Sequence, residues 1–70
     1  MKEYEVVDNM GNWMTVDEEW LEGVERLDEA VWMQFNRLPH EELEVRYKNG
    51  ETVYYVPNSS GEWYVAYNFV

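Results

Sequence analysis

Four glutamates, Glu18, Glu22, Glu25 and Glu29, follow one another at spacings of four, three and four residues. On a helix this spacing places them within about 60° of one another, as an acidic row about 16 Å long. Like charges at these spacings destabilise a helix by about 0.2–0.5 kcal/mol per pair. An ordinary exposed helix alternates glutamate with lysine, so the row indicates a surface that binds a basic partner.

The acidic row has two other interpretations. It can be the solvated face of an acidic protein, since most runs of charge are no more than this. It can also collect a metal ion, but hard cations need about 6–8 converging oxygens, and a convex helix does not converge them. We therefore expect no metal site and no cofactor.

Further side chains flank the row on the same predicted helix. Acidic neighbours extend the charge, and Trp32 or Met33 offers an apolar anchor for a partner. A tryptophan at the margin of an apolar stripe is also typical of peripheral core. The predicted partner-binding residues are Asp17, Glu18, Glu19, Glu22, Glu25, Asp28, Glu29, Trp32 and Met33.

Enzyme chemistry finds few candidates in the chain. There is no cysteine, and the single histidine, His40, lies between Pro39 and Glu41 in a predicted turn, where a solvated surface residue is the simpler interpretation. Ser59 and Ser60 have no base at a recognisable spacing. We expect a protein that is not an enzyme.

Length and composition limit the classes of function. Seventy residues predict one domain, residues 1–70, and 15 acidic against 5 basic residues give a net charge of −10. This charge excludes direct binding to nucleic acid or to an anionic membrane, because both need basic patches. A hydrophobic fraction of 46% argues against disorder. With neither a membrane-length apolar run nor a signal peptide, the chain is expected in the cytoplasm.

The elements that position the acidic row begin with a predicted helix over residues 16–37. Thr15 and Glu18 have the spacing of a capping box, and Pro39 ends the helix. Apolar residues recur at helical spacing along one side: Trp20, Val24, Leu27, Val31, Phe35 and Leu38.

Strands are predicted on both sides of this helix. Residues 1–7 form a short strand that can join either edge of a sheet. A three-stranded meander follows from residue 43, with a two-residue turn at Asn49-Gly50 and a four-residue loop over residues 58–61. This register pairs Val45 with Tyr54 and Val56 with Trp63. The predicted fold class is α+β, one long helix packed on a small antiparallel sheet.

The back of the meander offers an alternative interface. The same register places Tyr55 opposite Tyr64, with Val53 on the same face. The N-terminal strand or the loop around Trp13 can cover this face. Left open, it fits a homodimer or another assembly, because tyrosines are enriched at binding hot spots.

In size, charge and the row of four glutamates, the chain resembles small acidic proteins that phages and mobile elements make to block host DNA-handling enzymes. The resemblance implies a non-enzymatic inhibitor that mimics DNA and occupies a basic, nucleic-acid-binding surface of a partner protein. The alternative is a structural or assembly protein that uses the face of Tyr55, Tyr64 and Val53.

Overall fold

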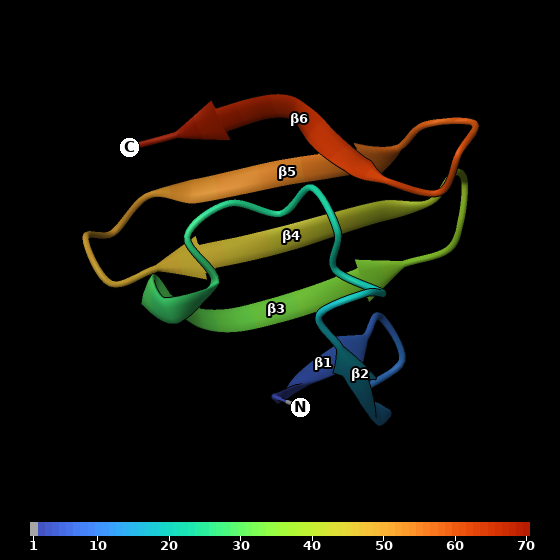
Figure 1. The fold of residues 1–70 in the computed structure, drawn as a ribbon, viewed down its shortest axis with the longest axis horizontal. Helices are drawn as coiled ribbons and strands as arrows, with labels where there is room; N and C mark the ends of the chain where they lie inside the picture. The colour runs from blue at the N-terminus through green and yellow to red at the C-terminus, as the bar shows by residue number, and fades with distance from the viewer. Residues whose placement is uncertain (1) are drawn as a thin grey trace.

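Six β-strands form a single mixed sheet in the computed structural model, which describes residues 2–70 (Figure 1). The strands are β1 (Glu3–Asp8), β2 (Trp13–Asp17), β3 (Ala30–Asn36), β4 (Glu42–Tyr47), β5 (Thr52–Pro57) and β6 (Trp63–Phe69), with a 3-10 helix η1 (Leu27–Glu29) before β3. Their spatial order is β2-β1-β3-β4-β5-β6. Neighbours are antiparallel except β1 and β3, which run parallel. Met1, the first residue of the predicted N-terminal strand, lies outside the described residues.

The helix predicted over residues 16–37 is wrong, and with it the α+β fold class. Its N-terminal end is the last part of β2, its middle is a series of turns, and its C-terminal end is β3. Gly23 has φ +99° and Arg26 has φ 51°, and a right-handed helix accommodates neither value. The fold is therefore all-β.

Three of the four hairpins of the sheet, β1–β2, β4–β5 and β5–β6, share one loop geometry. Each has a three-residue loop that ends in a glycine with φ near +90°: Gly11, Gly50 and Gly61. In each, a backbone N–H bonds across the loop, as from Tyr47 to the Glu51 carbonyl over 2.8 Å. A type I turn followed by a left-handed glycine produces this loop.

This loop geometry corrects the predicted register of the meander. Strands β4, β5 and β6 are present as predicted, but both turns differ by one residue, so Val45 pairs with Val53 and Pro57 with Trp63. A one-residue shift turns side chains to the opposite face. Tyr55 therefore lies in the core, whereas Tyr54 lies on the opposite face of the sheet. A bulge between Tyr54 and Tyr55 then places Tyr67 beside Tyr54.

An irregular segment, residues 18–29, covers the core side of the sheet and is called the covering segment below. In Figure 1 it crosses over β3 and β4 between the end of β2 and the start of β3. Its Leu21 and Val24 are buried in one cluster with side chains of the sheet. The buried residues of this core are Val6, Val7, Leu21, Val24, Met33, Phe35, Leu43, Val45, Tyr47, Val53, Tyr55 and Trp63.

Hydrogen bonds to the sheet hold the covering segment in place. The Tyr47 hydroxyl donates to the Glu25 carbonyl (2.6 Å), and the Glu25 N–H donates to the Tyr55 hydroxyl (3.2 Å). The Trp63 N–H donates to the Glu22 carbonyl (2.8 Å). Because buried backbone groups need partners, these bonds allow a segment without regular structure to cover a core.

Candidate functional site

The structure separates the residues of the predicted acidic row. Glu18, Glu22 and Glu25 are exposed along the covering segment, and Glu29 lies 3.9 Å from Arg26. Because no helix aligns them, they do not form the 16 Å row that the helical spacing predicts. Their charge remains on one segment, but its regular geometry is absent.

The residues predicted to flank the row have different positions. The Asp17 carboxylate accepts a hydrogen bond from the Trp20 backbone N–H (2.9 Å), and Glu19 and Asp28 are both exposed. Met33 is buried in the core, and Trp32 lies on the opposite face of the sheet under the Arg46 guanidinium, 4.2 Å from its ring centroid. Neither apolar anchor is therefore beside the acidic side chains.

The alternative interface does not exist as a single surface. Tyr55 and Val53 are buried at 0% and 3% exposure, whereas Tyr64 is 51% exposed. Tyr55 pairs with Val65 rather than with Tyr64. Tyr64 instead shares its face with a cluster in which Tyr54 and Tyr67 stack at 4.6 Å and Phe69 packs edge-on.

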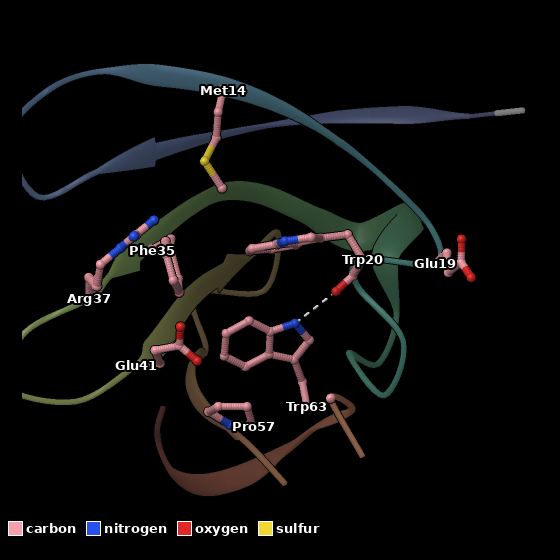
Figure 2. Close-up of a pocket in the computed structure, with 9 residues that line it drawn as sticks. Met14, Glu19, Trp20, Phe35, Arg37, Glu41, Pro57 and Trp63 are labelled. Atoms are coloured by element: carbon pink, nitrogen blue, oxygen red, sulfur yellow. Dashed lines mark hydrogen bonds between the residues drawn. The ribbon is translucent and has the colours of Figure 1, made fainter. Parts of the chain in front are cut away.

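Three aromatic rings converge at one end of the core, and we call them the aromatic corner: Trp20, Phe35 and Trp63. The Trp20 and Phe35 ring centroids are 5.5 Å apart at 83°, and those of Phe35 and Trp63 are 6.0 Å apart at 81°. Trp20 and Trp63 are 5.4 Å apart at 52°. The rings are thus steeply inclined to one another, and a cavity of about 460 Å³ is lined by all three (Figure 2).

Each ring of the aromatic corner is positioned by a different element. Phe35 projects from β3, Trp63 begins β6, and Trp20 belongs to the covering segment. The Trp63 indole N–H donates to the Trp20 carbonyl over 2.9 Å, a bond drawn in Figure 2. With the bond from the Trp63 backbone N–H to the Glu22 carbonyl, this contact ties the covering segment to both the backbone and the side chain of Trp63.

Charged side chains surround the aromatic corner. Glu19, Glu41 and Arg37 line the cavity and are exposed, and the half-buried, apolar Met14 and Pro57 line it as well. In Figure 2 the Glu41 carboxylate points toward the side of the Trp63 ring, and the ring of Phe35 lies between Arg37 and Trp63. The Arg37 guanidinium lies 5.7 Å from the Phe35 centroid. Two carboxylates and one guanidinium give the rim a net negative charge.

A second cavity of about 290 Å³ adjoins the first and shares Met14, Phe35 and Arg37 with it. Its outer residues include Met10 and Leu38, which are 82% and 76% exposed. These exposed apolar side chains enlarge the surface beside the aromatic corner on which a partner can pack.

The charge of the whole surface is strongly unbalanced. Of the fifteen acidic side chains, four lie within 4.0 Å of a cationic or potentially cationic group: Glu29, Glu42, Glu44 and Glu51. The other eleven have no such partner among residues 2–70. The Arg26 guanidinium donates to Glu51 at 2.7 Å, and this hydrogen bond lowers the pKa of that carboxyl. Burial raises the pKa of Tyr47.

Within the described part of the chain, no group of three or more His, Asp or Glu side chains is arranged to hold a metal ion. No helix among residues 2–70 has the length and apolar character needed to cross a membrane. Comparison of the chain with protein families, with curated proteins and with solved structures found no match.

The sequence pattern predicts burial of the three rings but not their convergence. It places Trp20 and Phe35 on a helix stripe and Trp63 on the apolar face of the meander. The corner forms because the covering segment reaches Trp63 at the start of β6, and this approach leaves no periodic signal in the sequence. The one available signal is Gly23, since a glycine often marks a close approach of two backbones.

Proposed function

We propose that this chain is a non-enzymatic binding protein of the cytoplasm that occupies a basic surface of a partner protein. The observation that carries the proposal is the set of eleven acidic side chains without a cationic partner among residues 2–70. Such a surface attracts a positively charged partner and accelerates the encounter. It repels nucleic acid and anionic lipids.

Among basic surfaces, one that normally binds nucleic acid suits this acidic chain best, because phosphate binding requires clustered lysine and arginine. The proposal does not depend on phosphate-like spacing, since the four glutamates do not form a row. It depends on competition, because an acidic protein and a duplex then occupy the same basic side chains. This is the sense in which the chain is an inhibitor.

The experiment uses immobilised protein and a cell extract, with elution by duplex DNA. Proteins that occupy their DNA-binding surface on the chain should be retained at low salt and released by the duplex. A variant with Glu18, Glu22 and Glu25 changed to Gln should retain less than a matched variant with Glu3, Glu5 and Glu62 changed to Gln. Both carry three fewer charges, −7 instead of −10.

All six glutamates in these two variants are exposed, and their carboxylates make no hydrogen bond within the described residues. Both variants should therefore fold like the wild type. Retained proteins that bind the chain and DNA together would contradict the competition. Equal retention by the two variants would contradict a role for the covering segment.

Strand β6 supports a second candidate function, self-assembly. Residues 63–70 carry no charged side chain in a chain of net charge −10, and β6 is an edge strand of the sheet. Five exposed large apolar residues lie here: Tyr64, Val65, Tyr67, Phe69 and Val70. Uncharged edge strands pair readily with another strand. Sedimentation at micromolar concentration should show a dimer that the substitution Val65→Lys dissociates; a wild-type monomer would contradict assembly.

A further inference from the structure

We propose that the aromatic corner of Trp20, Phe35 and Trp63 is a binding site for a lysine-type ammonium group, methylated or not, of a partner protein. This inference rests on the proposed function, because it names the chemical group that the acidic protein would take from a basic partner. It adds a defined pocket to what is otherwise a diffuse charge effect.

The first support is the geometry of the rings. A cation about 4.2 Å in front of two perpendicular rings places their centroids about 5.9 Å apart, within the distance at which an aromatic face attracts a cation. The Trp20–Phe35 and Phe35–Trp63 separations of 5.5 and 6.0 Å at 83° and 81° are edge-to-face contacts compatible with this arrangement, with Trp20 half-buried and Phe35 and Trp63 each 6% exposed. The cavity of about 460 Å³ lined by these rings has room for an alkylammonium group.

The second support is charge. Glu41 and Glu19 line the same cavity, and Glu41 points toward the side of the Trp63 ring (Figure 2). A carboxylate beside an aromatic face favours a cation there. Arg37 opposes it, but in Figure 2 the ring of Phe35 lies between Arg37 and Trp63. The rim therefore prefers a cationic group to an anionic or neutral one.

The shape of the corner selects lysine over arginine. A guanidinium is planar and stacks on a single ring, whereas an ammonium is compact and accepts contact from several directions. Three steeply inclined rings surround a compact group better than a planar one. Methylation enlarges the ammonium without removing its charge, so the site should bind trimethyl-lysine at least as well as lysine.

The test is an NMR titration of the full chain with a Gly/Ser peptide that carries one central lysine, observing the indole N–H signals of Trp20 and Trp63. The same peptide with trimethyl-lysine, arginine or acetyl-lysine supplies the comparison. We expect trimethyl-lysine to bind at least as tightly as lysine, arginine to bind more weakly, and acetyl-lysine not to bind. Equal binding of the acetyl-lysine or arginine peptide would overturn the inference.

Variants of the rim separate the pocket from the overall charge. Glu41→Gln should weaken binding of the lysine peptide about threefold, and the distant Glu3→Gln should change it little. Arg37→Gln should strengthen binding, whereas Lys48→Gln, with the same change of charge, should not. The side chains of Glu41 and Arg37 are exposed, so these variants keep the fold. Equal effects within each pair would overturn the site.

A tryptophan pair tests the ring directly. Trp20→Leu should reduce the affinity for the lysine peptide about tenfold. Trp13→Leu serves as the control, because Trp13 is 60% exposed on β2 and does not line the cavity. If the protein captures partners that duplex DNA releases, but Trp20→Leu binds the lysine peptide like wild type, the aromatic corner is not the binding site and the proposed function stands. If the lysine peptide binds but no such partner is captured, the proposed function fails and the pocket stands.

Discussion

Replacing Gly23 by alanine should destabilise the protein far more than the same change at another glycine of similar backbone conformation. A Cβ at Gly23 would lie 2.0 Å from the Trp63 carbonyl oxygen and 2.9 Å from its carbonyl carbon. Gly23 also has φ +99°, which L-residues rarely adopt. Gly11 has φ +88° but nothing within 4 Å of an added Cβ. Gly11→Ala is therefore a control for the backbone conformation alone.

The size of the effect follows from the contacts at Gly23. A left-handed alanine costs about 1 kcal/mol relative to glycine once the stiffer unfolded chain is counted. Relief of the clash requires the covering segment to move away from β6. That movement breaks the hydrogen bonds from Trp63 to the Glu22 and Trp20 carbonyls, each about 1–2 kcal/mol when a buried group is left unpaired. Together these give about 3–5 kcal/mol for Gly23→Ala.

Urea denaturation followed by tryptophan fluorescence and by far-UV circular dichroism measures both variants. A domain of this length has a free energy of unfolding of about 3.5–10 kcal/mol, so a loss of about 3–5 kcal/mol removes at least about a third of it and should lower the urea midpoint of Gly23→Ala accordingly. Gly11→Ala should lose about 1 kcal/mol and stay folded. Equal losses in the two variants would refute the close packing of Gly23 on Trp63.

Three further measurements test the hydrogen bonds and the charge. Tyr47→Phe removes the hydroxyl that donates to the Glu25 carbonyl and should lower the free energy of unfolding by about 1–3 kcal/mol. Burial raises the pKa of Tyr47, so the contribution of its hydroxyl to the free energy of unfolding is full below the ordinary pKa of 10.0 and is lost as pH rises. The difference in free energy of unfolding between Tyr47→Phe and wild type should therefore shrink at alkaline pH, and a constant difference would contradict this. Arg26 lowers the pKa of Glu51, so the advantage of wild type over Glu51→Gln in Tm should be full above pH 4.5 and decline as pH falls below it, and an undiminished advantage in acid would contradict the ion pair. Finally, Tm should rise between about 0.05 and 0.5 M NaCl because salt screens repulsion among unpaired carboxylates, and a flat response would show that they do not repel one another in the fold.

The sequence predicted the C-terminal meander because its signals are local. Gly50 and Gly61 each follow a polar residue and mark the two turns, and alternating apolar residues mark the strands on each side. These local signals do not determine the register of the strands. Asn49-Gly50 fits a two-residue loop and also a three-residue loop with the glycine in the left-handed position, and the structure has the second. One residue of difference exchanged the core and outer faces of β5.

The predicted helix failed for a different physical reason. Spacings of three and four residues between Trp20 and Leu38 matched a helix stripe, but these residues belong to the covering segment, η1, β3 and the loop after it. Val31 and Leu38 are 60% and 76% exposed, so the stripe has no common buried face. Tertiary contacts decide this segment, because its buried side chains contact strands that are distant in the sequence.

The candidate site depends on the least regular part of the chain, and this links its stability to its function. The covering segment contributes Trp20 to the aromatic corner and Glu19 to the rim of its cavity. No ladder of backbone hydrogen bonds holds this segment. Bonds to Tyr47, Tyr55 and Trp63 hold it instead. A substitution that releases these bonds should therefore open the aromatic corner before it unfolds the sheet. In Tyr47→Phe, binding of the lysine peptide should weaken while the far-UV signal of the strands is unchanged, and parallel loss of both would show that segment and sheet form one cooperative unit.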